Sequence, residues 1–531
     1  MRIDEYKPKQ NVTEKINGEE VEWKNGDIVL ISSGTASGKS YFIRHKLEQL
    51  ADQQNVNILL LVNRKNLYKQ NKEAIDNSLF SRIKVELYQT IENQLNNDEE
   101  YDFSPYTYIV CDESHYFTTD SGFNDNSDDS LQAILGLQSQ IRIFMSATGH
   151  VLFSYIKDQY RRKLKRTGNK IWTYTIPRKF NQIASLSFYT DFYAVEKWIE
   201  RKFNKANDKI IYFADTIQKA FELYQKYDDS LFVCSQSGSK NRKYLKHVDN
   251  DQVESMVKQN RFDCKYLFTT TVLDNGFDLK DEHIKLIVCD IFDVDTMLQC
   301  IGRKRFKNDQ DKVHVVLLNR NNRNLNNYLR TVQKKLDEAD AFIKGGVQEW
   351  KKLVGKFSRE SNYIIKDNAI SDGKYISKKT VSRVKYLQAV AMRDRIKAML
   401  DQNRETNNFR EETGGRKESD AYMMYISNLL HKNKIMLIEK RFEQEELCSY
   451  LDTIVGKRIY KDGKNQVIEK FDIKDYRGRL QKDISQLQSY LQSNQLKYAI
   501  ASFPDNRKKL EDGSNNPHKG KRYWLVSKFN E

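Results

Sequence analysis

The chain has 531 residues, more than a single hydrophobic core organises, so we expect more than one domain. Lys and Arg number 89 against 73 Asp and Glu, and the net charge of +16 favours a polyanionic partner such as nucleic acid. No apolar run approaches the ~20 residues of a membrane helix, no apolar signal region opens the chain, and no CxxC pair occurs among the six cysteines. These features exclude a membrane-spanning protein and a zinc or iron–sulfur module, and they predict a cytoplasmic protein with reduced thiols.

The first predicted element is a buried parallel strand, the apolar run Ile28 to Ile31. Small residues follow it, including Gly34 and Gly38, and then Lys39 and Ser40 open a predicted helix. Small residues let backbone N–H groups close around phosphate oxygens, and a helix N-terminus adds partial positive charge. In such a loop the lysine reaches the β- and γ-phosphates and the serine hydroxyl binds Mg²⁺. The alternative is an ordinary turn between a strand and a helix.

Two carboxylates end the strand predicted over Tyr108 to Cys111. Asp112 and Glu113 stand at its C-terminal end, which is where open α/β sheets bind their ligands. Asp112 is a candidate Mg²⁺ ligand, and Glu113 a candidate for polarising an attacking water. A solvated acidic turn is the alternative, and the phosphate loop upstream argues against it.

The two sites resemble motifs I and II of the superfamily 2 helicases, in the DExH form Asp112-Glu113-Ser114-His115. Further blocks fit that resemblance in the same order. Ile58 to Leu67 looks like motif Ia, and Ser146-Ala147-Thr148 like motif III. The resemblance implies that Arg64 contacts the nucleic-acid backbone. It also implies that the short segment ending at Thr90 faces the nucleic-acid strand.

Three later segments of the chain resemble motifs IV, V and VI. Lys209 to Thr216 resembles motif IV, Tyr266 to Asp278 motif V, and Gln299 to Arg305 motif VI. In motif V the resemblance implies that Thr270 contacts nucleic acid and that Gly276 and Asp278 approach the nucleotide. In motif VI it implies that Gln299 lies near the γ-phosphate, that Arg303 is an arginine finger and that Arg305 is a second finger. The family places that second arginine one residue later, where this chain has Phe306.

The predicted fold class is α/β, with two RecA-like, doubly wound parallel-sheet domains and a mostly helical C-terminal accessory region. We expect the first lobe over residues 1–180, the second over 181–325 and the accessory region over 326–531. Gln402 to Lys417 is predicted to be a loop. Near the C-terminus, a predicted helix and two strands around a basic loop resemble a winged-helix wing, which would bind nucleic acid through Lys519, Lys521 and Arg522; a small capping hairpin is the alternative.

The sequence therefore predicts an ATP hydrolase that needs ATP and Mg²⁺, acting as a helicase or translocase on nucleic acid, with DNA favoured over RNA. Three alternatives stay open: a duplex-DNA translocase that does not unwind, an RNA helicase, and a nucleic-acid-binding protein switched by ATP. Ser33 stands where the strict phosphate loop has Gly, and Arg305 stands one residue before the family's second arginine. These two departures leave room for weak hydrolysis, as expected of a switch. The composition, rich in Lys, Asn, Ile and Tyr, is typical of AT-rich bacterial or phage genomes.

Overall fold

The computed structural model of the 531-residue chain describes most of its residues. The described ranges are 11–34, 37–76, 81–97, 99–119, 126–177, 180–235, 241–271, 278–308, 310–354, 362–370, 376–412, 418–432, 437–473, 479–494 and 496–529. The chain divides into two compact units. One comprises Met1–Phe188 with Ile199–Ile435, and the other comprises Tyr189–Trp198 with Met436–Glu531.

The first lobe, lobe 1, is built on a six-stranded sheet whose neighbouring strands are all parallel, in the order β3-β2-β4-β5-β1-β6. Its strands are β1 (Ile28–Ser33), β2 (Ile58–Val62), β3 (Ile83–Leu87), β4 (Tyr108–Cys111), β5 (Ile141–Ser146) and β6 (Ile171–Ile176). Strands β1, β2, β4 and β5 are almost wholly buried, as continuous apolar runs covered on both faces should be.

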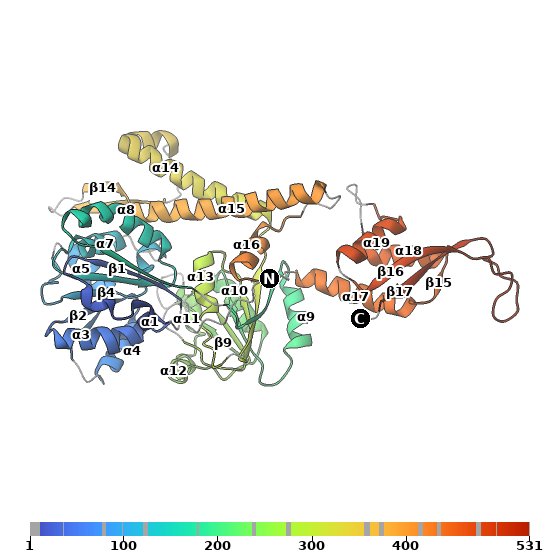
Figure 1. Ribbon diagram of the computed structural model, residues 1–531, viewed down its shortest axis with the longest axis horizontal. Helices are drawn as coiled ribbons and strands as arrows, with labels where there is room; N and C mark the ends of the chain where they lie inside the picture. Colours follow the sequence, from blue (N-terminus) through green and yellow to red (C-terminus); the bar gives the residue numbers. More distant parts are fainter. Residues whose placement is uncertain are drawn as a thin grey trace. The chain divides into compact units, whose positions relative to one another are not determined.

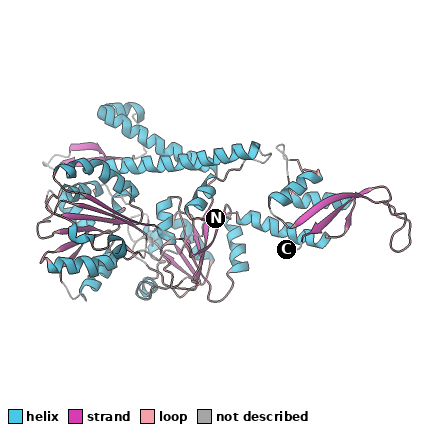
Figure 2. Cartoon of the chain, viewed as in Figure 1, coloured by secondary structure: helices cyan, strands magenta, loops and turns pink. Residues whose placement is uncertain are grey.

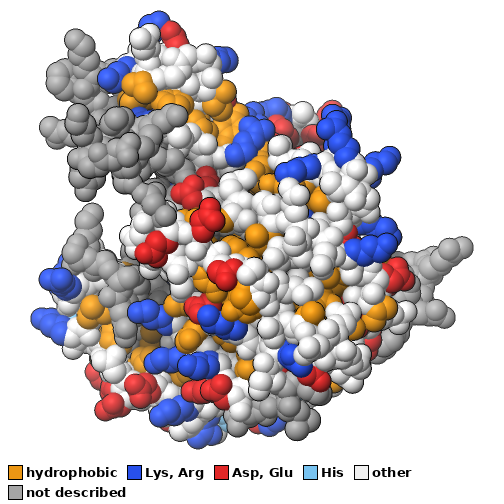
Figure 3. Space-filling view, turned by 90° about the vertical axis from the view of Figure 1, so that its left-hand side faces the viewer, with side chains coloured by type: hydrophobic (Ala, Val, Ile, Leu, Met, Phe, Trp, Pro, Cys, Tyr) orange, Lys and Arg blue, Asp and Glu red, His pale blue; other side chains and the backbone are white. Residues whose placement is uncertain are grey.

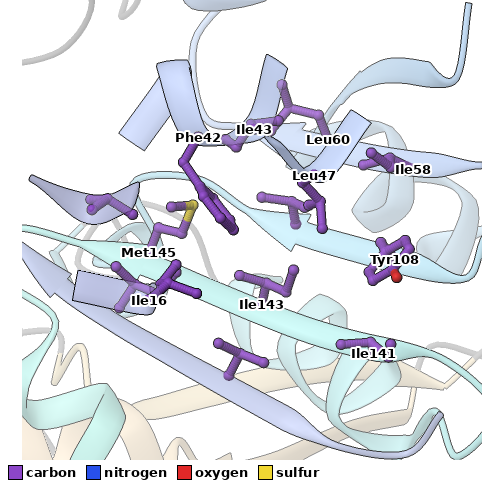
Figure 4. Packing of buried hydrophobic residues seen from close by; sticks show 14 of the residues in the cluster. Ile16, Phe42, Ile43, Leu47, Ile58, Leu60, Tyr108, Ile141, Ile143 and Met145 are labelled. Carbon is purple, nitrogen blue, oxygen red and sulfur yellow. The ribbon is translucent and has the colours of Figure 1, made fainter. Parts of the chain in front are cut away.

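Helices cover both faces of this sheet (Figure 1). One face packs against α1 (Val12–Ile16), the continuous helical segment α2 (Lys39–Phe42), η2 (Ile43–Leu47) and α3 (Glu48–Gln53), and α4 (Lys65–Asp76). Figure 4 shows this core, with Phe42, Ile43 and Leu47 above Ile143 and Met145 of the sheet. The other face packs against α5 (Tyr88–Asn96), α6 (Tyr116–Thr119), α7 (Ser127–Gly136) and α8 (His150–Arg166). A short 3₁₀ turn, η1 (Glu19–Glu22), precedes β1.

The second lobe, lobe 2, is built on another six-stranded sheet in the order β7-β12-β11-β8-β10-β9, and the strands from β12 to β9 are parallel. Its strands are β7 (Ile183–Tyr189), β8 (Lys209–Phe213), β9 (Ser230–Val233), β10 (Tyr266–Thr269), β11 (Ile284–Cys289) and β12 (Val313–Leu318). Its helices are α10 (Ile217–Lys226), α11 (Arg242–Leu245), α12 (Asn250–Gln259) and α13 (Val294–Ile301), whereas α9 (Phe192–Lys202) begins in the second unit and ends in the first. Two parallel sheets flanked by helices confirm the predicted RecA-like, doubly wound fold class.

The chain after lobe 2 is mostly helical, as predicted, and begins with α14 (Asn322–Val354), the hairpin β13 (Ile365–Ile370) and β14 (Ile376–Val381), α15 (Arg383–Glu412) and α16 (Ala421–Leu429). The prediction of a loop over Gln402 to Lys417 is wrong as far as Glu412, because α15 continues to that residue. Polar contacts, and not an apolar face, stabilise this part of the helix. The buried Asn403 donates a hydrogen bond to Asp420 and accepts one from Asn322. Residues 413–417 lie outside the described part of the chain.

The second unit ends in a small α/β fold, drawn in red in Figure 1 and by element type in Figure 2. Along the chain it contains α17 (Ile438–Ile454), β15 (Arg458–Ile459), α18 (Lys461–Phe471), α19 (Ile484–Ser493), β16 (Tyr498–Pro504) and β17 (Arg522–Lys528). The strands form an antiparallel sheet in the order β15-β17-β16. The element order is thus a helix, a strand, two helices and two strands joined by a long loop. The winged-helix-like wing and its binding of nucleic acid stay a prediction.

Candidate active site

The parallel order of the first sheet brings three loops to one edge. Strand β5 lies between β1 and β4, so the ends of these strands are neighbours although they are far apart in the sequence. Gly34 follows β1, Asp112 follows β4, and Ser146 is the last residue of β5. The carboxyl edge of such a sheet is its usual ligand site. The three loops are those of the predicted motifs I, II and III.

The loop after β1 turns sharply into α2. Gly38 has a φ of 87°, a left-handed conformation that glycine adopts without a Cβ penalty. The Ser37 hydroxyl donates a hydrogen bond of 2.7 Å to the Gly34 carbonyl, which closes the described part of the loop. Lys39 begins the helix and is buried. The backbone N–H groups that open α2 therefore stand at the carboxyl edge of the sheet, beside a lysine ammonium.

Glu113 lies between two potential cations. Its Oε1 atom is 3.4 Å from Nζ of Lys39, and its Oε2 atom is 3.2 Å from Nδ1 of His115. Burial opposes ionisation of Glu113, but the Lys39 ammonium and the contact with His115 outweigh burial and lower the pKa of Glu113 well below its usual range. Glu113 has a φ of 47°, which is uncommon for a residue with a side chain and typical of strained functional loops. The carboxylate is thus ionised and held by its neighbours.

Asp112 has the opposite electrostatic character. Burial, together with the adjacent Glu113 carboxylate, raises the pKa of Asp112 to about 6. Its Oδ1 accepts a 2.9 Å hydrogen bond from the Glu113 N–H, and its backbone carbonyl accepts one from the buried Tyr88 hydroxyl. Two carboxylates whose pKa values are pushed apart by their surroundings are a recurrent sign of a functional site.

A chain of polar contacts leads from this pair toward lobe 2. Nδ1 of His115 lies 3.2 Å from Oγ of Ser146, and Ser146 Oγ accepts a 3.0 Å hydrogen bond from the Thr148 N–H. Nε2 of Gln299, on α13 of lobe 2, then donates a 2.9 Å hydrogen bond to Oγ1 of Thr148. All four side chains are buried. The predicted motifs II, III and VI are therefore in direct contact.

A cavity of about 510 Å³ opens beside the phosphate loop and is lined by both lobes. Of the predicted residues it takes in Gly34, Gly38, Lys39, Ser40, Asp112 and Glu113 from lobe 1, and Asp278, Arg303 and Arg305 from lobe 2. On the lobe 2 side, Oδ1 of Asp278 lies 2.7 Å from Arg305 and 3.9 Å from Arg303. Among the described residues, the buried Nε of Arg305 has no hydrogen-bond partner, which leaves a donor for a ligand.

The remaining predicted site residues do not line this cavity. Gln299 is buried and donates its hydrogen bond to Thr148. Arg64 is exposed in the turn between β2 and α4, Thr90 lies in the first turn of α5, and Thr270 follows β10. Their contact with nucleic acid stays a prediction. Gly276 lies outside the described residues.

Sequence reasoning missed several residues that line the cavity. Tyr41 and Arg44 lie one and four residues after Ser40, and this spacing places them on one side of the helix that follows the loop. Leu67 and Asn71 of α4 also line the cavity, and Lys280 of lobe 2 adds a cation to its lining. The spacing of Tyr41 and Arg44 could have been read from the sequence. The other three depend on how distant elements pack.

The described surface shows no gathering of basic side chains on the face seen in Figure 3, where Lys and Arg are interspersed with Asp and Glu. Within the described residues, no helix is long and apolar enough to cross a membrane.

No protein-family model matches the chain, and a search of curated proteins finds no match. Among solved structures, the chain is similar to Mss116p bound to ssRNA and AMP-PNP, at 15% identity and a TM-score of 0.42, over 67% of this chain and 83% of that one. It is also similar to S. cerevisiae Dbp5 bound to RNA and ADP BeF3, at 15% identity and a TM-score of 0.39, over 62% of this chain and 84% of that one. The Escherichia coli DEAH/RHA helicase HrpB aligns at 14% identity and a TM-score of 0.37, over 58% of this chain and 42% of that one. At such TM-scores the likeness carries no argument about function, which has to come from the site itself.

Proposed function

We propose that this chain is an ATP-dependent nucleic-acid helicase or translocase that hydrolyses ATP between its two lobes. One observation carries the proposal: Lys39 and Glu113 of lobe 1 share a single cavity with Arg303 and Arg305 of lobe 2. Phosphoryl transfer is catalysed mainly by positioning and by cations around the transferred group, and this cavity brings such cations together from both sides.

The residues present fit a nucleoside triphosphate with Mg²⁺. The glycine turn at Gly38 and the N-terminus of α2 suit phosphate oxygens, and Lys39 and Arg305 add positive charge around the cavity. Ser40 and Asp112 offer the hydroxyl and carboxylate oxygens that Mg²⁺ prefers. When bound, Mg²⁺ would supply neutralisation of the phosphate charge.

Within this proposal Glu113 is the general base. A base must be ionised to accept a proton from water, and Lys39 and His115 keep Glu113 in that form. Arg303 and Arg305 would stabilise negative charge from the opposite lobe. The hydrogen bond from Gln299 to Thr148 supports a mechanical connection, because it joins the lobe that carries the arginines to the loop next to the base.

The deciding experiment is ATP hydrolysis by the full chain, measured alone and with single-stranded DNA, duplex DNA or RNA. We expect single-stranded DNA to stimulate turnover most. Stimulation by RNA alone would assign an RNA helicase. Stimulation only by duplex DNA, without unwinding of a tailed duplex, would assign a duplex translocase. Tight ATP binding with no turnover under any condition would contradict the motor and leave an ATP-dependent switch.

The variant Glu113→Gln tests the assignment of the base. Removing a general base costs about 10²–10⁴-fold in rate, so we expect kcat to fall by that amount while ATP still binds. The matched control is Glu99→Gln, which changes an exposed glutamate of lobe 1 outside the cavity. Normal turnover in Glu113→Gln would remove Glu113 from the mechanism.

A further inference from the structure

The C-terminal sheet β15-β17-β16 has one covered face and one open face. Trp524 and Val526 of β17 and Ile500 of β16 are buried in the core that this unit forms with α17, α18 and α19. Successive side chains of a strand point to opposite faces. The alternate residues of the same strands, among them Phe503 and Tyr523, therefore point to the face that the helices do not cover.

This open face carries a row of aromatic rings. Phe503 and Tyr523 are cross-strand partners, with ring centroids 6.0 Å apart, and Phe503 is 42% exposed. The row continues from Tyr523 to Tyr460, at 6.0 Å, and from Tyr460 to His518, whose ring stacks on it at 3.8 Å. Ala501, on the same strand as Phe503 and two residues before it, is small and exposed, so the Phe503 ring has an open flank.

Positive charge gathers on the same two strands and the loop between them. Residues 497–528 contain eight Lys and Arg against three Asp and Glu, whereas the rest of residues 436–531 contains eleven of each. The guanidinium of Arg458 lies over the Tyr523 ring, 5.1 Å from its centroid. Lys508, Lys519 and Lys521 are exposed. The net positive charge of residues 436–531 thus lies on these two strands and their loop.

We propose that the open face of this sheet binds single-stranded nucleic acid, with bases stacking on Phe503 and Tyr523 and phosphates neutralised by the lysines of the 505–521 loop. Every base presents a π-face, and aromatic platforms beside basic side chains bind single strands without reading sequence. This inference rests on the proposed function and adds that the nucleic-acid partner is single-stranded.

A single strand fits this unit better than a duplex. A helix that enters a duplex groove needs basic side chains for the flanking phosphates. Helix α19, which precedes the two long strands, runs from Ile484 to Ser493 and contains neither Lys nor Arg. The cations stand instead beside the rings, where an unpaired strand would expose its bases.

The test is photo-crosslinking of the full chain, without nucleotide, to 20-nucleotide oligonucleotides that carry 5-iodouracil, as DNA and as RNA. We expect adducts on the peptides that contain Phe503 or Tyr523. Stacking of one base on one ring is worth about 5- to 150-fold in affinity, so the double variant Phe503→Ala/Tyr523→Ala should bind at least fivefold more weakly in fluorescence anisotropy. Tyr523→Phe keeps a ring and should retain binding, which separates stacking from loss of folding.

Two further variants complete the design. Phe529→Ala removes a phenylalanine outside the row that is 55% exposed, and it should leave affinity unchanged. Lys519→Gln with Lys521→Gln should reduce the slope of log affinity against log salt by about 1.4, since each phosphate contact to a single strand contributes about 0.7. The ratio of DNA to RNA adducts decides which strand the face prefers.

Adducts confined to residues 1–435, with unchanged affinity of the double variant, would overturn this inference and leave the proposed ATPase site standing. Failure of the proposed function has a different signature, which is ATP turnover that no nucleic acid stimulates, whatever residues 497–528 bind. Crosslinking to Phe503 only in the presence of a protein partner would also contradict the inference.

Discussion

Nε2 of Gln299 donates a 2.9 Å hydrogen bond to Oγ1 of Thr148, and this contact joins lobe 2 to the loop after β5 of lobe 1. Thr148 in turn donates its N–H to Ser146, which lies beside His115. The bond therefore links the helix that leads to Arg303 with the side chains that hold Glu113. It offers a direct route by which movement of one lobe reaches the base.

Replacing Gln299 with alanine should weaken that route. A side-chain hydrogen bond is worth about 0.5–1.5 kcal/mol, so we expect the stimulation of ATP turnover by nucleic acid to fall by about two- to tenfold, with a smaller change in the basal rate. Steady-state ATPase rates with and without single-stranded DNA measure both. Gln252→Ala, on the exposed side of α12, is the control. An equal loss in both rates would place Gln299 in the hydrolysis step and not in the connection.

Arg303 and Arg305 should differ in their importance. Both line the cavity, but Arg305 is paired closely with Asp278, whereas Arg303 is near enough to Glu113 to help lower the pKa of that carboxyl. We expect Arg303→Ala to reduce kcat by about 10³–10⁵-fold and Arg305→Ala to reduce it less. Arg261→Ala, an exposed arginine of lobe 2, should have no effect. If Arg305→Ala is the more damaging variant, the roles of the two arginines are reversed.

An ion pair between the accessory helix and lobe 2 should stabilise the first unit. Arg395 of α15 lies 2.9 Å from Asp295 of α13 and 3.3 Å from His150 of α8, and both members of the pair are mostly buried. Removing one partner leaves the other charge buried and unpaired. We expect Arg395→Ala to lower the thermal midpoint by several degrees, and Arg404→Ala, on an exposed turn of the same helix, to leave it unchanged.

A double-mutant cycle distinguishes this pair from general packing. The losses in Arg395→Ala and Asp295→Asn should be clearly less than additive when the two are combined, because each single change already breaks the same contact. Additive losses would show that Arg395 stabilises the unit through its other neighbours.

Asp27 should make stability depend on acid pH. Its carboxylate accepts hydrogen bonds from Trp172, Lys170, Asn169 and Lys24 at the start of β1 and β6. Burial opposes ionisation, but these bonds outweigh it and lower the pKa of Asp27. A lowered folded pKa means that this contribution is complete above the ordinary pKa of an aspartate and is lost as pH falls through the folded value.

We therefore expect Asp27→Asn to unfold at a lower temperature than the natural chain at pH 7, and the difference to shrink below about pH 4. Thermal unfolding followed by circular dichroism from pH 3 to 7 measures it. Asp158→Asn, on the exposed surface of α8, should follow the natural chain throughout. A difference that persists unchanged at pH 3 would mean that the charge of Asp27 contributes nothing.

The local pattern of apolar residues was enough to predict most of the fold. Continuous apolar runs such as Ile58–Val62 become buried strands because a parallel sheet covered on both faces needs them. The same reasoning failed at Gln402–Glu412, where a polar segment is helical because Asn403 finds Asp420 and Asn322 from other elements. Partners so distant in the chain leave no periodic signal at the segment itself.

The amino-acid order alone identified the candidate phosphate-binding residues and the two carboxylates. It could do so because a strand, a glycine turn and a helix form within about a dozen residues. Which of them meet was decided only in three dimensions. The pairing of Lys39 with Glu113 joins residues 74 positions apart, and the bond from Gln299 to Thr148 joins residues 151 apart. Lys280 reaches the cavity from 241 positions beyond Lys39. Such contacts follow from the order of strands in the sheets and from the packing of one lobe on the other, which no short stretch of sequence records.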